Sequence, residues 1–303
     1  MKRYSRIDQI PRGHATKDIA PGCLVLEGGA FRGLYTSGAC DALMQAGLNF
    51  ESTLGVSAGA LNAISYVSGQ IGRSGRANLE HRLDKDYVGL KPLLSNGSVI
   101  GFDYLFGPMS ELEPLDQESF FNPNRRFFVA ATNCDTGELE VFEKNENASD
   151  TQYIYQAIRA SSSMPYLSKM IEINGHRYLD GGCHTKIPFQ WAIDQGYEKI
   201  VVIRTRPRSY RKNIRKIDQH IPSIIYRNYP QFAQKLAAMN LKYNQDCEQM
   251  ERLEKEGRIF VIAPSKPVTV SRLESDLQKL GELYEMGLFD TQNAIHKLKE
   301  YLS

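Results

Sequence analysis

The chain has no apolar run close to the roughly 20 residues that a membrane-crossing helix needs. Residues 1–21 contain no apolar core of the kind that a signal peptide needs. The formal net charge of +2 is too small to favour a nucleic-acid partner or global attraction to a membrane. These absences predict a cytoplasmic protein without a nucleic-acid partner, and they leave open a peripheral contact at the inner face of a membrane.

Cysteine is scarce and shows no pairing pattern. There are five cysteines, an odd number, and no two of them form a Cys-x-x-Cys motif. Scattered cysteines of this kind are typical of a reducing compartment, in which most thiols are buried.

The composition is that of an ordinary globular protein, with 303 residues, 42% hydrophobic and 24% charged. Short apolar runs that stop at glycines predict strands at 23–26 and 50–55. A helix over 33–47 follows the first strand, and the small-residue segment 57–63 begins a helix after the second. Two such strand–glycine–helix units predict an α/β fold with a mixed, mainly parallel sheet.

The segment Ser68–Pro123 is less regular. It begins with glycines spaced three residues apart, at 69, 72 and 75, and later contains the aromatic residues Phe102, Tyr104 and Phe106. A long connection with exposed aromatics is a candidate lid or substrate-facing insertion. The alternative is a surface excursion that packs its own aromatic side chains.

The rest of the chain continues the alternation of strands and helices and then becomes mainly helical. Expected strands are 126–132, 139–142, 177–182, 199–204 and 258–264, and expected helices are 151–161, 188–196, two within 221–256 and two within 271–302. We expect the strand at 258–264 to join the same sheet. The predicted organisation is an N-terminal arm (1–22), a catalytic domain (23–204) and a mainly helical C-terminal region (205–303) packed on that domain.

A candidate nucleophile lies in Gly55-Val56-Ser57-Ala58-Gly59, which matches Gly-x-Ser-x-Gly. A serine on a tight strand-to-helix turn has strained backbone angles, and Gly55 and Gly59 remove side-chain clashes around it. The turn lifts the hydroxyl out of the carboxyl edge of the sheet, and the dipole of the following helix lies behind the site.

A candidate oxyanion hole follows the first strand. Its residues are Gly28, Gly29, Ala30, Arg32 and Gly33. Small residues let backbone N–H groups approach an oxygen closely, and the next helix N-terminus favours negative charge. Such a loop can also hold phosphates in nucleotide-binding folds, but the spacing departs from Gly-x-Gly-x-x-Gly and no Walker lysine follows.

A candidate base is Asp180, which precedes Gly181 and Gly182. A carboxylate within hydrogen-bond distance of the serine could accept its proton directly. The alternative is that Asp180 only caps a turn.

Together, these three segments resemble the patatin-like phospholipase family. The chain shows Gly28-Gly29-Ala30-Phe31-Arg32-Gly33, then Gly55–Gly59, then Asp180-Gly181-Gly182, in the order of the family pattern. The resemblance spans residues 23–204. Two positions depart from the pattern: Ala30 replaces a third glycine, and Lys186 stands two residues before Pro188, where an asparagine is common.

The resemblance implies a three-layer α/β/α, lysophospholipase-like fold and a Ser57–Asp180 dyad. It implies that Ser57 attacks a carboxylic ester of a lipid, that Asp180 accepts its proton, and that an acyl-enzyme forms. Backbone N–H groups of the oxyanion loop would stabilise the developing charge. Arg32 would anchor that loop, assist the anion or position a phosphate-bearing substrate. No metal or other cofactor is implied, and the expected partner is a lipid or acyl ester substrate, a phospholipid or lysophospholipid.

Other functions stay open at this point. A Ser-His-Asp triad would need a late histidine, and only His220 and His296 are available. Acyl transfer to an alcohol would use the same dyad, and a non-catalytic lipid-binding protein could retain the fold. The sequence specifies neither headgroup, chain length nor oligomeric state.

A basic stretch between Arg204 and Arg227 is a candidate contact with anionic lipids. Its cations are Arg206, Arg208, Arg211, Lys212, Arg215 and Lys216, against the single acid Asp218. The alternative is a solvated loop.

Overall fold

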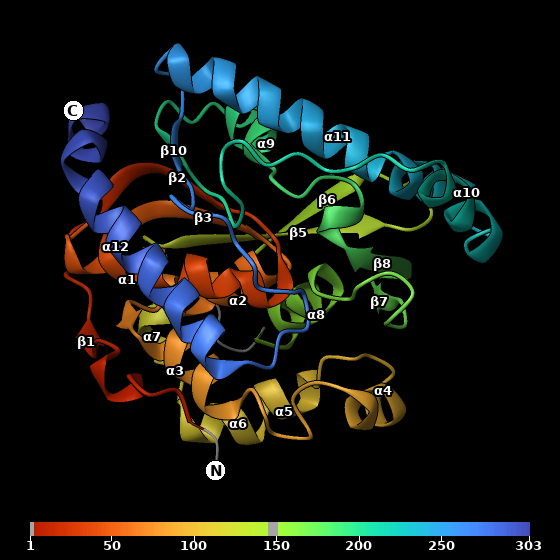
Figure 1. Ribbon diagram of the computed structural model, residues 1–303, viewed down its shortest axis with the longest axis horizontal. Helices are drawn as coiled ribbons and strands as arrows, with labels where there is room; N and C mark the ends of the chain where they lie inside the picture. Colours follow the sequence, from red (N-terminus) through yellow and green to blue (C-terminus); the bar gives the residue numbers. More distant parts are fainter. Residues whose placement is uncertain (1–2, 145–150) are drawn as a thin grey trace.

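The computed structural model describes residues 3–144 and 151–303 and contains an eight-stranded sheet between two layers of helices (Figure 1). The strands of this sheet are β2 (Ala20–Leu26), β3 (Phe50–Val56), β5 (Arg126–Asn133), β6 (Leu139–Glu143), β7 (Ile171–Ile173), β8 (His176–Asp180), β9 (Ile200–Ile203) and β10 (Phe260–Ile262). A separate two-stranded ribbon pairs β1 (Gly13–His14) with β4 (Gln70–Ile71).

The helices flank both faces of the sheet. They are α1 (Gly33–Gln45), α2 (Ala58–Val67), α3 (Arg73–His81), α4 (Leu90–Asn96), α5 (Phe102–Phe106), α6 (Pro108–Leu112), α7 (Gln117–Phe120), α8 (Thr151–Ser161), α9 (Phe189–Asp194), α10 (Lys216–Ile225), α11 (Pro230–Lys255) and α12 (Leu277–Leu302). In Figure 1, α1, α2, α8 and α12 lie on one side of the sheet, and α9 and α11 on the other. Because successive strand residues face opposite sides, Leu24 packs into the core on the first side and Val25 into the core on the second.

The strand order is β10-β9-β2-β3-β5-β8-β7, with β6 also paired to β5. Strands from β10 to β5 are parallel, whereas β6, β7 and β8 pair antiparallel. The predicted three-layer α/β/α fold with a mixed, mainly parallel sheet is therefore confirmed. The strand predicted at 258–264 is also confirmed, since β10 pairs with β9 at the edge of this sheet.

The strand β5 has three neighbours, and their registers show which edge each one occupies. β6 pairs with residues 128–132 of β5. β3 pairs with 126–130 and β8 with 131–133, so each overlaps β6 but the two do not overlap each other. Since one edge of a strand holds one partner at a time, β3 and β8 share the edge opposite β6, one after the other.

Because β3 runs parallel to β5 and β8 antiparallel, the carboxyl ends of β3 and β8 meet. Val56 is opposite Ala130, and Asp180 is opposite the next residue, Ala131. Ser57 directly follows β3. The sheet topology alone thus brings Ser57 beside Asp180.

One prediction about the tail is wrong. Residues 277–302 form a single helix, α12, where two helices were expected within 271–302. The glycines at 281 and 287 do not end the helix. They lie where other parts of the chain pack against it so closely that a side chain would not fit. A Cβ on Gly281 would lie 2.2 Å from the ring of Tyr4, and one on Gly287 would lie 2.0 Å from the carbonyl oxygen of Tyr35 in α1.

The expectation for Ser68–Pro123 is also corrected. The segment contains α3 to α7, and its aromatics are not exposed: Phe102 is buried, and Phe106 stacks on Tyr155 of α8 with ring centroids 4.4 Å apart. The helix α3 could not be predicted from an apolar stripe, because arginines occupy much of its buried face. A lid role for this segment stays a prediction, as do the proposed boundaries at 22/23 and 204/205. Among the described residues, no helix is both long and apolar enough to cross a membrane.

Candidate active site

Ser57 lies on a sharp turn between β3 and α2 with φ 55° and ψ −124°, a left-handed conformation that is costly for a residue with a side chain. Two hydrogen bonds stabilise the turn. The N–H of Ser57 donates to Oγ of Ser161 at 2.8 Å, and that hydroxyl donates to the carbonyl oxygen of Ala130 at 2.6 Å. Ser161 at the end of α8 thus joins the strained turn to β5 in the sheet.

The glycines two residues before and after Ser57 lie too close to neighbouring backbone for any side chain to fit. A Cβ on Gly55 would lie 2.5 Å from the backbone of Ala60, and one on Gly59 would lie 2.4 Å from the carbonyl oxygen of Leu26. Real Cβ atoms do not approach other atoms this closely. Both glycines therefore have the space-making role that the motif predicts.

The Ser57 hydroxyl donates a hydrogen bond to Asp180, with Oγ and Oδ2 2.7 Å apart. The other carboxylate oxygen, Oδ1, accepts from the N–H of Gly182 at 2.7 Å. Ser57 is 7% exposed and Asp180 8% exposed. A Cβ on Gly181 would lie 2.3 Å from the carbonyl oxygen of Ala130, so this turn also tolerates only glycine. The predicted nucleophile and base are in direct contact.

The loop predicted to form an oxyanion hole has fewer free N–H donors than its sequence suggests. The N–H of Gly28 donates to the carbonyl oxygen of Lys186 at 3.3 Å, and that of Gly33 donates within the 3-10 turn that precedes α1. Within the described chain, the N–H groups of Gly29 and Ala30 have no acceptor. Ala30 has φ 51°, so the alanine adopts a left-handed conformation that suits glycine.

The N–H of Ala58 is a further candidate donor to an oxyanion, and it was not predicted from the sequence. It is the first residue of α2, where N–H groups have no partner within the helix. The signal was present, because the residue after the nucleophile commonly supplies an oxyanion donor in Gly-x-Ser-x-Gly turns.

Arg32 does not anchor the loop by hydrogen bonds. Its Nε is buried and has no acceptor among the described residues. Burial lowers the pKa of the Arg32 guanidinium to about 10, and the nearby Arg206 adds to this effect. The side chain instead lines a cavity beside Ser57.

Two cavities meet at Ser57. The apolar cavity, about 100 Å³, is lined mainly by hydrophobic side chains such as Phe31, Leu34, Leu61, Ile64, Leu105 and Met109. The second cavity, about 490 Å³, also contains Asp180, and we call it the cationic chamber. Its cations are Arg32, Lys186, Arg206, Lys212, Arg215 and Arg272. Ser57 and Ala30 line both cavities, as does Met164.

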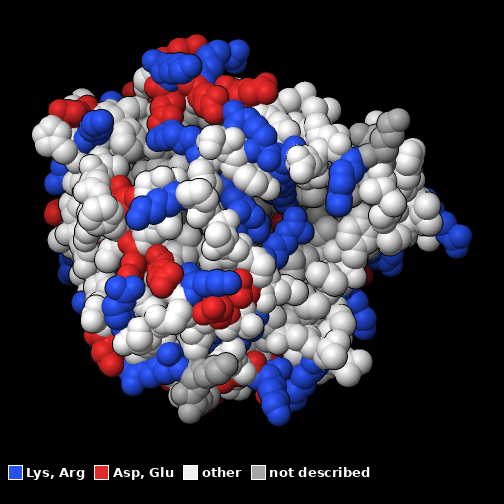
Figure 2. Space-filling view, viewed as in Figure 1, with Lys and Arg blue, Asp and Glu red and all other residues white. Residues whose placement is uncertain are grey.

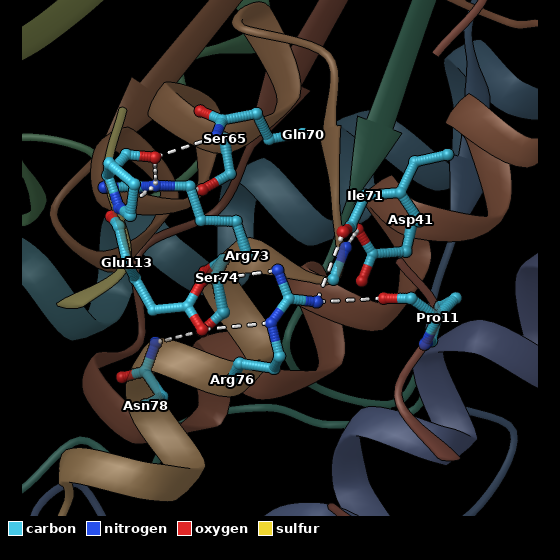
Figure 3. Close-up of polar contacts among 12 residues, drawn as sticks. Pro11, Asp41, Ser65, Gln70, Ile71, Arg73, Ser74, Arg76, Asn78 and Glu113 are labelled. Carbon is cyan, nitrogen blue, oxygen red and sulfur yellow. Dashed lines mark hydrogen bonds and ion pairs between the residues drawn. The ribbon is translucent and has the colours of Figure 1, made fainter. Parts of the chain in front are cut away.

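The insertion Ser68–Pro123 supplies one wall of the apolar cavity, and a buried arginine network holds that wall (Figure 3). Arg76 donates from Nε and Nη2 to the two carboxylate oxygens of Glu113, at 3.0 and 3.3 Å. Its Nη1 donates to the carbonyl oxygen of Pro11 at 3.0 Å. Arg73 donates to the carbonyl oxygen of Glu113 at 3.0 Å and to the hydroxyl of Ser65 in α2 at 3.2 Å.

None of the six histidines lines either cavity. His220 lies on α10 and is exposed, and His296 lies on α12 beside Glu300, with Nδ1 and Oε1 3.4 Å apart. The structure therefore brings neither candidate triad histidine to Ser57.

The basic stretch divides into two groups. Arg208 and Arg211 form ion pairs with Glu254 and Glu251 of α11. The cations that remain near the site, among them Arg206 and Lys212, line the cationic chamber. The side chains of Lys216 and Asp218 lie outside the described residues.

The fold and site define an α/β protein with an acid–serine pair on a glycine-framed turn. Residues 24–193, more than half of the chain, match the family described as patatin-like phospholipase, and the protein belongs to this family. Residues 229–303 match a second family, a domain of unknown function (DUF6363).

The chain is also similar to individual proteins of other organisms. The uncharacterized protein YjjU of Escherichia coli K12 is 27% identical over 288 residues, covering 87% of this chain and 74% of its own length. Lysophospholipase NTE1 of Cryptococcus neoformans is 26% identical over 211 residues, which cover 63% of this chain but 12% of that protein. Among solved structures, VipD from Legionella pneumophila aligns with a TM-score of 0.47 and 14% identity, over 99% of this chain and 71% of VipD.

Proposed function

We propose that the protein is a serine hydrolase that cleaves carboxylic ester bonds of phospholipids or lysophospholipids through Ser57 and Asp180. The observation that carries the proposal is the 2.7 Å hydrogen bond from Ser57 to Asp180 at the point where the two cavities meet. Membership of a lipid hydrolase family gives independent support.

The first half of the reaction forms an acyl-enzyme. Oγ of Ser57 attacks the ester carbonyl carbon while Asp180 accepts the hydroxyl proton. The carbonyl electron pair moves to oxygen, where the free N–H groups of Gly29, Ala30 and Ala58 stabilise the charge. The intermediate then expels the alcohol, which takes the proton from Asp180.

The second half releases the acid. A water molecule gives a proton to Asp180 and attacks the acyl carbon, forming a second tetrahedral intermediate. That intermediate expels Oγ of Ser57, which recovers the proton from Asp180. The carboxylic acid leaves and the resting hydrogen bond re-forms.

The test is hydrolysis of phospholipids, lysophospholipids and short acyl esters by wild type, Ser57→Ala and Asp180→Asn. Each variant should lower kcat by about 10⁴-fold or more, because the groups of such a site act as a unit. A fluorophosphonate probe should label wild type at Ser57 and leave folded Ser57→Ala unlabelled. Wild-type rates in Ser57→Ala would refute the proposal.

Three alternatives have their own outcomes. Loss of activity in His220→Ala or His296→Ala would favour a triad. Transfer of the acyl group to an added alcohol in preference to water would identify an acyltransferase. Failure of the probe to label folded protein would favour a lipid-binding role.

We further propose that the protein works at a membrane surface, docked through α10. The support is a row of exposed isoleucines on this helix, which projects from one end of the molecule (Figure 1). Ile217 is 61% exposed and Ile224 72% exposed. Basic residues on both sides of the helix, such as Arg215 and Arg227, would favour anionic lipids. Replacing Ile217 and Ile224 with serine should weaken binding to anionic vesicles, and unchanged binding would exclude this surface.

Five free and buried cysteines support a reducing, cytoplasmic location.

A further inference from the structure

The cationic chamber holds an unusual concentration of one charge sign. Its six cations converge from the oxyanion loop, the segment after β8, the loop between β9 and α10, and the segment before α12. Figure 2 shows Lys and Arg side chains around a recess near the middle of one face. The lining carboxylates are already engaged, since Glu27 accepts from the N–H of Thr205 at 2.6 Å and Asp180 accepts from Ser57 and Gly182.

Two of these cations have buried polar atoms with no acceptor among the described residues. They are Nε of Arg32 and Nζ of Lys212. By contrast, Arg208 and Arg211 in the same basic loop do not line the chamber, and each pairs with a glutamate. Burying a cation is costly, and the two carboxylates of the lining, Glu27 and Asp180, are outnumbered by its six cations.

The electrostatics agree with this geometry. Burial lowers the pKa of Lys212 to about 5, and Lys186 adds to the effect. Burial also lowers the pKa of Lys186 itself. An anion placed among these side chains would offset both the desolvation and the mutual repulsion.

We propose that the cationic chamber binds the phosphate-bearing headgroup of the substrate and selects headgroups with net negative charge, such as phosphoglycerol, over phosphocholine. This inference rests on the proposed function, and it names the substrate class for that site. Ser57 lines both cavities, so an ester there has its acyl chain in the apolar cavity and its phosphate in the chamber.

The preference against choline follows from the aromatic residues. A quaternary ammonium is normally recognised by aromatic faces. Three tyrosines line the chamber, and two of them already face cations of the protein itself. The guanidinium of Arg206 lies 4.6 Å from the ring centre of Tyr210, and Nζ of Lys212 lies 4.4 Å from that of Tyr243. The third, Tyr166, packs on Tyr226 with ring centroids 5.5 Å apart. A choline group placed beside Tyr210 or Tyr243 would meet positive charge instead of a free aromatic face.

The first experiment compares three esters with one decanoyl chain, below their micelle concentrations: lysophosphatidylglycerol, lysophosphatidylcholine and monodecanoylglycerol. We expect kcat/KM for the phosphoglycerol lipid to exceed that for the phosphocholine lipid at least tenfold, with the ratio falling as salt is added. Equal rates for the two phospholipids, or faster cleavage of the choline lipid, would overturn the inference.

The second experiment removes single charges. Lys212→Met and Arg272→Gln should each lower the ratio of kcat/KM between the two phospholipids at least threefold. The matched control is Lys297→Met, an exposed lysine of α12 outside the chamber's lining, which should leave the ratio unchanged. An unchanged ratio in both chamber variants would contradict the assignment.

A binding measurement separates this inference from the proposed function. Calorimetry with Ser57→Ala should detect glycerophosphoglycerol, with at least tenfold weaker binding in Ser57→Ala/Lys212→Met. Binding without Ser57-dependent cleavage of any ester would refute the proposed function and keep the anion site. Cleavage of monodecanoylglycerol without any binding of glycerophosphoglycerol would keep the proposed function and refute the anion site. Binding of inorganic phosphate but not of glycerophosphoglycerol would identify a free-anion site and overturn the headgroup assignment.

Discussion

Buried cations lie on both sides of Ser57, but their surroundings differ. Beside the apolar cavity, Arg73 and Arg76 direct their guanidinium groups at Glu113, at backbone carbonyls and at Ser65. Beside Ser57 and Asp180, Arg32 and Lys212 have buried nitrogens without acceptors in the described structure. Arg73 and Arg76 thus have hydrogen-bond acceptors within the chain, whereas these nitrogens of Arg32 and Lys212 have none among the described residues.

The difference separates a structural role from a binding role. A buried arginine with a complete set of acceptors fixes the elements it joins, and its loss leaves those acceptors unsatisfied. A buried cation without acceptors reduces stability until a ligand supplies them. The two sides should therefore respond in opposite directions when a charge is removed.

The largest effect is expected on the partnered side. Arg76→Met should lower the free energy of unfolding by about 3–5 kcal/mol, because the carboxylate of Glu113, only 13% exposed, and the carbonyl oxygen of Pro11 lose their donor. Urea denaturation measures this loss. The control is Arg252→Met on the exposed face of α11, which should change stability by less than about 0.5 kcal/mol. Equal losses of stability in Arg76→Met and Arg252→Met would show that the acceptors of Arg76 do not give it a structural role.

A second prediction concerns Asp41, which lies behind the same wall (Figure 3). Its carboxylate accepts from the N–H of Gly72 at 2.8 Å and from the hydroxyl of Tyr284 at 2.6 Å, but burial raises its pKa to about 7. The folded protein thus binds the proton more tightly than the unfolded chain. This contribution to stability is fully present below about pH 4 and is lost as the pH rises through 7.

Asp41→Asn should remove that dependence. Between pH 4 and 7, wild type should lose up to about 1.4 kcal/mol of stability per pH unit relative to the variant. Denaturation curves of both proteins at four pH values test this. A constant difference across the range would show that Asp41 keeps its ordinary pKa.

The same contrast explains what could be predicted from the sequence. Most strands of the large sheet, the Ser57 turn and the loop at Gly28–Gly33 are local patterns, and the structure places them as expected. The short strands β1, β4 and β7 were not predicted. The wall at α3 gave no periodic signal, since Arg73 and Arg76 lie on its buried face and their acceptors are distant in the chain.

The cationic chamber was harder still to predict. Lys212 appeared within a basic stretch that suggested a membrane contact or a solvated loop, and nothing near it in sequence points to Arg32 or Arg272. Only the meeting of four segments makes them one site. In the same way, the contact between Ser57 and Asp180 depends on β3 and β8 sharing one edge of β5.

On the unpartnered side, Lys212→Met should raise stability. The substitution keeps an apolar side chain near Tyr243 and removes a buried amine whose charged form is disfavoured there, so we expect a gain of about 1–2 kcal/mol without ligand. Thermal or urea unfolding of the ligand-free proteins measures it. Glycerophosphoglycerol should stabilise wild type more than the variant, reducing or reversing the gain. A loss of stability comparable to that of Arg76→Met would show that the chamber is structural.

The smallest effect is expected where the two cavities join, at Ala30. Its φ of 51° strains an alanine but suits glycine, so Ala30→Gly should raise the free energy of unfolding by about 0.5–1 kcal/mol. Ala46→Gly is the matched control, because Ala46 has φ −84°, and there the same substitution should reduce stability. If Ala30 also holds an oxyanion donor in place, the more flexible Ala30→Gly loop should lower kcat a few-fold while KM stays nearly constant. A more stable variant with full activity would mean that the strain at this junction does not serve catalysis.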